Sequence, residues 1–443
     1  MIFDDIAAFT LGPLFVPDSA RDMAATLLID TLGVAAGAVD LAPARIARDH
    51  AARFLAAPSA GAAATLLFDG RRASLAGAAF AAATQIDNLD AHDGYNPTKG
   101  HIGCAVVPAL CAFAEHMPQL TARDALTALT MSYEVAARAG IALHATADDY
   151  HTSGAWNALG VAALGCRLRG HSPDRLRHAL GIAEYHGPRS QMMREIANPT
   201  MLHDGSGMGA LVGMMAVLLA EDGFGGAPAI TVEAPEVARH WADLGRTWTI
   251  ERNYIKPYPS CRWAHAALDA LTILRRDHSF GPDDVTAIEV RTFEQAAKLY
   301  AGMPDTTSQA QYSLPFALAS LLVHGTLGPD QVQGAGLRDT AVAAHLDKIT
   351  VTEDARHSAR FPAARWSDIT VHLTSGATLT SGDVHARGGP EAPMPLQDVA
   401  DKFHLMTRPL GHARQTALWS MRDALLQDDV RFADLLALIH APA

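Results

Sequence analysis

The stretch QIDNLDAHDGYNPTKGHIGC, residues 85–104, places side chains that transfer protons between two alanine-rich runs. Its acidic and basic members are Asp87, Asp90, His92, Asp93, Lys99 and His101, and three glycines allow the backbone to turn. Histidine titrates near neutral pH, and a carboxylate beside it can fix its tautomer and raise its basicity. We therefore predict that this loop supplies general acid/base groups. The alternative is a solvated loop whose aspartates cap helices.

A second histidine, His151, comes directly before a run of small residues, in ADDYHTSGAWNALG. The run predicts a helix, and the positive end of the helix dipole favours anions at its N-terminus. We predict that His151 points into a cleft there. The alternative is ordinary helix capping by Thr152 or Ser153.

Lys256, Arg262 and His265 surround two prolines and a cysteine in IKPYPSCRWAHAALDAL. Arginine binds carboxylates through two parallel hydrogen bonds, so a rigid hinge that carries these cations predicts a carboxylate clamp. A plain structural linker is the alternative. No local pattern marks Cys261 as an activated thiolate.

The stretch GPRSQMMREIANPTMLHDGSGMG sets Arg189, Arg194 and His203 in otherwise apolar surroundings. Its glycines match neither a dinucleotide-binding loop nor a P-loop, and the chain has no HExxH, EF-hand or GxSxG motif. The 21 histidines leave a metal site as an alternative, without any recognisable ligand spacing.

The elements around these groups are mostly helical. Apolar residues recur at helical spacing from about residue 18 to residue 250, with capping signals at Thr121 and Ser172. Strand-like alternation begins near residue 281, and a hairpin is predicted around Ser375 and Gly376. We predict a mainly α fold, with a large all-helical domain (residues 1–255 and 396–443) and an inserted, smaller α+β lid domain (residues 256–395). A groove between the two is the expected site.

Composition excludes several other classes. The chain of 443 residues has a formal net charge of −12 and no basic run, which argues against nucleic-acid binding. Its four cysteines include no CxxC pair. No apolar run reaches about 18 residues, so we expect no membrane segment and a cytoplasmic protein.

Seven segments resemble the MmgE/PrpD family in sequence and order. They are LLIDTLGVAAGAV, QIDNLDAHD…KGHIG, SYEVAARAG, HTSGAWNALGVAALG, YPSCRWAHAALDAL, QYSLPFALASLL and PLQDVADKF. The family includes 2-methylcitrate dehydratase, cis-aconitate decarboxylase and iminodisuccinate epimerase. The resemblance implies a large helical domain with an α+β lid, a homodimer, and catalysis without metal or organic cofactor.

Matched position by position, the resemblance implies specific site residues. Asp87 and Asp90 match the first and last aspartates of the family's D-x-D-D stretch, with Leu89 in place of the middle one and Ala91 where decarboxylase-like members have threonine or serine. His101 and His151 match its two active-site histidines, and Lys256 matches the lysine before the P-S-C stretch.

Two positions depart from the family pattern. Thr200 replaces a carboxylate-binding lysine, and Phe316 replaces the tyrosine of the decarboxylase-like members. These departures put decarboxylation of cis-aconitate in doubt. His92, Lys99, Arg189 or Arg194 would compensate or would recognise another substrate.

The family chemistry implied is proton transfer at a carbon next to a carboxylate. We expect a lyase, in particular a hydro-lyase, acting on a di- or tricarboxylate of the 2-methylcitrate type. His101 is then the main acid/base, oriented by Asp87 or Asp90, and His151 is the second. Lys256 and Arg262 bind carboxylates, and the expected pocket also includes His203, His92, Lys99 and Arg194. The alternatives are an epimerase or decarboxylase, a non-catalytic carboxylate-binding protein, and a metal-dependent hydrolase.

Overall fold

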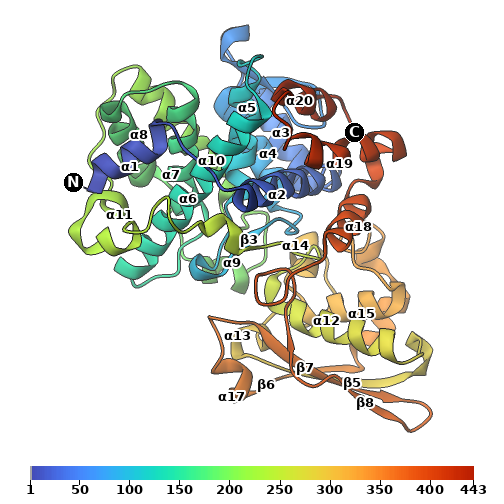
Figure 1. Ribbon diagram of the computed structural model, residues 1–443. Coiled ribbons are helices and arrows are strands. Elements are labelled where there is room, and N and C mark those ends of the chain that lie inside the picture. Colours follow the sequence, from blue (N-terminus) through green and yellow to red (C-terminus); the bar gives the residue numbers. More distant parts are fainter. Residues whose placement is uncertain (1) are drawn as a thin grey trace.

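The computed structural model describes residues 2–443, and most of the chain is helical (Figure 1). The predicted mainly α fold is confirmed. The helices that precede the large sheet in the chain and form the helical part are α1 (Ile2–Leu11), α2 (Asp18–Gly37), α3 (Ala42–Phe54), α4 (Leu75–Asp87), α5 (Gly103–Ala114), α6 (Ala122–Thr146), α7 (Gly154–Leu168), α8 (Pro173–His186), α9 (Met192–Ala197), α10 (Ser206–Glu221) and α11 (Ile230–Glu233).

Helices α4, α5, α6, α7 and α10 build the centre of this part. Nearly all the apolar side chains of α4, α5, α6 and α7 are buried, while α10 also exposes Met208 and Met215. Small residues let the axes approach closely, because an added Cβ at Gly160 would lie 2.7 Å from the Ala136 side chain. The predicted caps are present: the Thr121 and Ser172 hydroxyls accept hydrogen bonds from the first turns of α6 and α8.

The second part is an α+β layer that lies below the helical mass in Figure 1. Its helices are α12 (Arg262–Asp277), α13 (Glu294–Ala297), α14 (Thr307–Gln311), α15 (Leu314–His324), α16 (Thr340–Leu346) and α17 (Ala355–Ser358). Its strands are β5 (Val285–Thr292), β6 (Ile349–Glu353), β7 (Trp366–Leu373), β8 (Thr378–Thr380) and β9 (Val384–His385).

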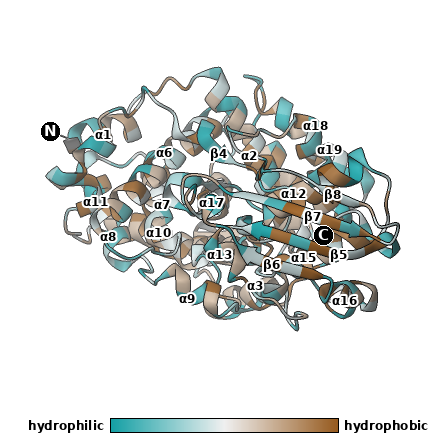
Figure 2. Cartoon of the chain, turned by 90° about the horizontal axis from the view of Figure 1, so that it is seen from below, coloured by the Kyte–Doolittle hydropathy of each residue, from teal (hydrophilic) through white to brown (hydrophobic). Residues whose placement is uncertain are grey.

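The strands form one sheet in the order β6-β5-β7-β8, with β9 also paired to β7. Only β5 and β6 are parallel. The predicted turn at Ser375 and Gly376 joins β7 to β8. Buried and exposed residues alternate along β5, because one face of the sheet packs on α12 and α15 while the other faces outward, toward the viewer of Figure 2.

The chain then returns to the helical part through α18 (Leu396–Met406), α19 (His412–Ala424) and α20 (Phe432–His440). Two short antiparallel pairings add to the predicted all-helical region: β1 (Ala63–Thr65) with β2 (Arg72–Ser74), and β3 (Gly94–Tyr95) with β4 (Asn253–Tyr254). The division into domains at residues 255 and 396 stays a prediction.

None of the single helices within residues 2–443 combines the length and apolar character that a membrane crossing requires. Helices α2 and α3 meet that test only when taken together, with a bend of 95° between them.

A buried ion pair fastens the returning chain to the helical part. The Lys402 ammonium of α18 donates hydrogen bonds to Asp30 of α2 and to the carbonyl of Ala91, each at 2.7 Å. Both side chains are almost fully buried, so burial raises the pKa of Asp30 and lowers that of Lys402.

Replacing Lys402 by methionine removes one member of this pair and leaves a buried carboxylate. We expect Lys402→Met to lower the free energy of unfolding by about 3–5 kcal/mol in urea titrations, the cost of breaking a buried pair. Lys298→Met, which removes an exposed pair with Glu294, is the matched control and should change stability little. Equal effects of the two variants would show that the buried pair does not hold α18.

Candidate active site

A small cavity lies where the helical part meets the α+β part. From the helical part it is lined by Asp90, Lys99, His101, Tyr150, Met192, Ile196 and Asp204. From the linker and the α+β part it is lined by Tyr254, Lys256, Cys261, Arg262, Trp263, Tyr312 and Arg365. Its volume is about 40 Å³, which is room for one or two water molecules. The predicted loop, the predicted cationic hinge and the expected groove therefore coincide.

The loop between α4 and α5 reaches the cavity because strand β3 pairs with β4 of the linker, Gly94 opposite Tyr254. Its glycines are needed for close approach. A Cβ at Gly94 would lie 2.3 Å from the Tyr254 hydroxyl, and a Cβ at Gly100 would lie 2.5 Å from the Ser153 hydroxyl. The loop therefore packs tightly between strand β4 of the linker and the N-terminus of α7.

His101 is buried and held by two hydrogen bonds. Its Nδ1 lies 2.6 Å from the carbonyl oxygen of Asp93, and its main-chain N–H donates to the Ser153 hydroxyl at 3.0 Å. A carbonyl only accepts, so Nδ1 carries the proton and Nε2 keeps its lone pair. Burial, with Lys256 nearby, lowers the pKa of His101 to about 3. The imidazole is a neutral base.

The carboxylate nearest to His101 is one that we did not predict. Asp204 Oδ2 lies 3.5 Å from His101 Nε2, and Asp204 Oδ1 accepts a 2.7 Å hydrogen bond from Ser153. Burial raises the pKa of Asp204. Ser153 therefore hydrogen-bonds to both His101 and Asp204. Its side chain does not cap α7, which the capping alternative for Ser153 would require.

Asp87 does not orient His101. Its carboxylate accepts hydrogen bonds from the N–H and the hydroxyl of Ser206, at 3.1 and 3.3 Å, at the start of α10. His92 lies between, with its ring centroid 4.4 Å from that of His101 and no hydrogen-bond partner on either nitrogen among the described residues. Neither Asp87 nor His92 lines the cavity.

Asp90 forms a buried ion pair with Lys256 instead. The Lys256 ammonium contacts Asp90 Oδ1 and lies 3.2 Å from the Asp90 carbonyl oxygen. The Asp90 backbone has a φ of 56°, a left-handed conformation that non-glycine residues seldom adopt. Burial alone would lower the pKa of Lys256, but Asp90 and Tyr254 raise it above its ordinary value, so the lysine stays charged.

Two guanidinium groups face the cavity without an anionic partner. Arg262 donates to the carbonyls of Arg387 and Ala386 at 3.0 and 3.2 Å, and Arg365 donates to that of Pro362 at 2.8 Å. Each Nε lacks a partner among residues 2–443. Burial lowers the pKa of Arg262 only to about 10, so it remains a cation.

Four cations, Lys99, Lys256, Arg262 and Arg365, thus share the cavity with two carboxylates, Asp90 and Asp204. An excess of buried positive charge requires an anionic partner. The arrangement suits a ligand with more than one carboxylate.

Other predicted residues lie outside the cavity lining. His151 Nδ1 lies 2.7 Å from the Asp149 carbonyl oxygen. The neighbouring Tyr150, and not His151 as predicted, lines the cavity. His203 is buried behind Tyr312, 3.4 Å from the Ser308 hydroxyl. Arg194 is exposed on the outer side of α9, whose inner side contributes Met192 and Ile196.

The cavity residues that sequence reasoning missed had weak signals or none. Asp204 directly follows His203, while Tyr150 and Tyr254 stand beside predicted residues. Tyr312 belongs to the QYSLPF segment, but it looked like a core aromatic. Arg365 lies in a loop before β7 with no motif around it. Long-range folding alone brings it to the cavity.

Side chains that by distance could hold a metal ion occur at the same place. Asp90, His92 and His101 have ligand atoms within 4.8 Å of one another. Asp90 Oδ1 is already paired with the Lys256 ammonium, and His101 Nδ1 is already hydrogen-bonded to the Asp93 carbonyl, so these atoms are not free to bind a metal ion. A further set, Asp354, His357 and Asp368, is occupied by the Arg356 guanidinium.

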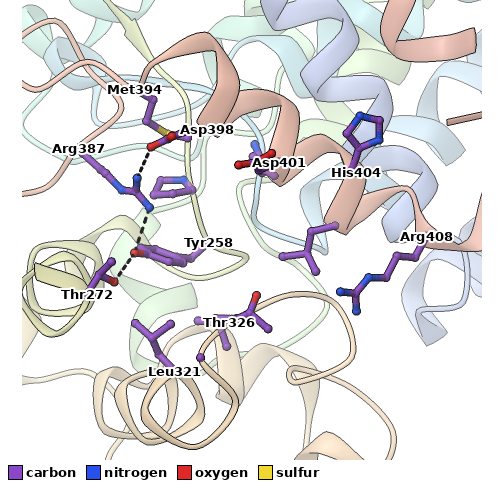
Figure 3. A pocket seen from close by; sticks show the side chains of 15 residues that line it. Tyr258, Thr272, Leu321, Thr326, Arg387, Met394, Asp398, Asp401, His404 and Arg408 are labelled. Atoms are coloured by element: carbon purple, nitrogen blue, oxygen red, sulfur yellow. Dashed lines mark hydrogen bonds and ion pairs between the residues drawn. The ribbon is translucent and has the colours of Figure 1, made fainter. Parts of the chain in front are cut away.

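A larger hollow, of about 580 Å³, lies between α18 and helices α12 and α15. Figure 3 shows Arg387 reaching Asp398 and Tyr258 there, at 2.7 and 3.4 Å. Arg387 and Asp398 pair within the hollow, whereas Lys402 and Arg408 pair with Asp30 and Asp330 outside its lining. Its histidine, His404, has no contact with a carboxylate like that of His101 with Asp204 among the described residues. The smaller cavity is the better candidate for chemistry.

Comparison with known proteins identifies the family of this chain. A model of the MmgE/PrpD N-terminal domain matches residues 8–242, and one of the MmgE/PrpD C-terminal domain matches residues 258–426. The cis-aconitate decarboxylase-like protein oryM of Aspergillus oryzae is 22% identical over 404 residues, which cover 80% of this chain and 80% of that protein. Because the two domain models together span most of the sequence, the chain belongs to the MmgE/PrpD family.

Proposed function

We propose that this protein is a lyase that removes a proton next to a carboxylate of a di- or tricarboxylate and expels a β-hydroxyl group as water. One observation carries the proposal. The neutral base His101 shares a small cavity with the guanidinium groups of Arg262 and Arg365, whose Nε atoms have no hydrogen-bond partner among the described residues. Membership in the MmgE/PrpD family, which supports lyase chemistry, agrees with it.

The reaction begins with proton removal by His101 Nε2. The electron pair left on carbon spreads into the adjacent carboxylate, which becomes an enediolate-like dianion. Fixed cations stabilise such charge most strongly where water is excluded. Lys256 lies beside His101 and is suited to this carboxylate, while Arg262 and Arg365 hold a second one. Asp204 receives or buffers the proton through its contact with His101.

Decarboxylation or epimerisation would use the same first intermediate and differ in what leaves afterwards. The relative from Aspergillus oryzae is named a cis-aconitate decarboxylase-like protein, which favours decarboxylation as the second candidate. Phe316, which replaces a tyrosine of the decarboxylase-like members, is fully buried and absent from the cavity lining. The position of Phe316 therefore does not distinguish dehydration from decarboxylation. The proposal requires no metal or organic cofactor, and a cytoplasmic homodimer remains a prediction.

Substrate entry requires movement. A cavity of about 40 Å³ cannot hold a six-carbon acid. Because the cavity walls come from both parts of the molecule, we propose that the α+β part moves away to admit substrate and closes to exclude water.

Proton NMR in D₂O with 2-methylcitrate, citrate, cis-aconitate and iminodisuccinate tests the reaction class. New vinyl signals from a saturated hydroxy acid report dehydration, release of carbon dioxide measured alongside reports decarboxylation, and deuterium at the α-carbon alone reports epimerisation. We expect His101→Ala to lower turnover at least about 10²–10⁴-fold, with unchanged circular dichroism. His116→Ala, whose ring contacts the Ala63 carbonyl far from the cavity, is the matched control. Retained activity in His101→Ala would remove His101 from the mechanism.

The pH profile tests the charge state of His101. An ordinary histidine has a pKa of about 6.5, whereas that of His101 is about 3, so the imidazole stays neutral throughout the interval between them. We expect log kcat/KM to stay level as the pH falls from about 7 to about 5, with no fall of unit slope centred near 6.5. Such a fall would show that the base becomes charged in the free enzyme.

Removing one unpaired guanidinium should weaken substrate binding. We expect Arg365→Met to raise KM about ten- to hundredfold, the value of one charge-assisted contact of about 1.5–3 kcal/mol. Arg360→Met is the control, because Arg360 stands on the same loop, pairs with Asp383 and lies outside the cavity. An unchanged KM in Arg365→Met would place the second carboxylate elsewhere.

A further inference from the structure

The reaction above needs a second acid, and the structure offers one that the sequence did not. Tyr312 lines the cavity, and its hydroxyl donates a hydrogen bond to Oε1 of Glu195 on α9. Glu195 is 5% exposed, and its Oε2 has no hydrogen-bond partner among residues 2–443. A buried carboxyl group that touches a cavity tyrosine is unusual enough to require an explanation.

Tyr312 is held firmly between the two parts of the molecule. Its carbonyl accepts a hydrogen bond from the Tyr300 N–H at 2.9 Å. The preceding residue, Gln311, accepts from the Cys261 N–H at 2.8 Å and donates to the Asn88 carbonyl at 2.9 Å. These bonds tie Tyr312 to the start of α12 and to the loop that carries His101. Such fixed geometry is what proton transfer requires.

Burial governs the protonation of both groups. Burial, and after it the nearby Asp204, raises the pKa of Glu195 well above its ordinary value, which favours the protonated carboxyl group. Burial and Glu195 raise the pKa of Tyr312 in the same way. Tyr312 is therefore a phenol that gives a proton, and Glu195 is a carboxylic acid that can replace it.

We infer that Tyr312 is the second catalytic acid, which protonates the departing β-hydroxyl group, and that Glu195 positions Tyr312 and restores its proton. This inference rests on the proposed function. His101 first takes the α-proton, and the C–H electron pair passes into the enediolate-like dianion described above. That pair then forms the new carbon–carbon double bond as the C–O bond breaks. The departing oxygen takes the Tyr312 proton and leaves as water, and the Glu195 proton passes to the phenolate oxygen. Return of the His101 proton to Glu195 through solvent restores the enzyme.

Other groups are less suited to this step. His151 lies outside the cavity lining, and the Tyr150 hydroxyl is occupied by the Lys99 carbonyl. The Tyr254 hydroxyl lies against Gly94, and its ring lies under the Arg262 guanidinium at 3.8 Å.

The test separates the two proton transfers. With an acid that the wild type dehydrates, Tyr312→Phe should lower turnover about 10²–10⁴-fold while exchange of the α-proton in D₂O continues near the wild-type rate. His101→Ala should lose both. Tyr300→Phe is the matched control, because its hydroxyl contacts the Met303 carbonyl outside the cavity. Parallel loss of exchange and turnover in Tyr312→Phe, or full turnover, would overturn the inference.

A second measurement needs no substrate. Infrared spectroscopy near neutral pH should show the carbonyl stretch of a protonated carboxylic acid that disappears in Glu195→Gln. Glu195→Gln should also turn over more slowly than the wild type while keeping exchange. An ionised Glu195 would overturn the relay. Failure of the proposed function shows differently, since the wild type itself would then neither exchange nor convert any acid of the panel.

Discussion

The buried ion pair between Asp90 and Lys256 is the contact on which the site depends. It joins the loop after α4 to the linker that leads into the α+β part, and it fixes Asp90 in a left-handed backbone conformation. Removing two charges from water costs several kcal/mol per ion unless the geometry is excellent and further hydrogen bonds are made. The β3–β4 pairing and the Asp90 carbonyl supply that support. Asp90 keeps Lys256 charged, and the charged Lys256 in turn lowers the pKa of His101, which therefore stays neutral.

This constraint divides the chemistry between the two parts of the molecule. The helical part brings the groups that move protons, His101 and Asp204, while the linker and the α+β part bring Lys256, Arg262 and Arg365. Neither half holds a complete site, and the cavity exists only when they meet. A binding-only protein would need the cations alone. The neutral histidine beside them, with its tautomer set by the Asp93 carbonyl, favours catalysis.

Much of this could be predicted because the informative residues are close in the sequence. Asp90, Lys99 and His101 share one loop, and Lys256 and Arg262 share one hinge, so their residue types and the glycines between them indicated a site. The roles expected for Asp87, His151 and Arg194 stay predictions. The structure places all three outside the cavity lining, because neighbouring residues of one segment point to different sides.

The sequence by itself determined the helical class, the inserted α+β part, the family and the stretches that carry chemistry. Each of these follows from local periodicity, capping signals and short motifs, which act over a few residues. The tertiary structure alone decided which side chains meet. Tyr312 meets Glu195 from 117 residues away in the sequence, and Arg365 reaches the cavity from a loop without a motif. The charge state of His101 likewise depends on burial and on Lys256, neither of which short-range spacing contains.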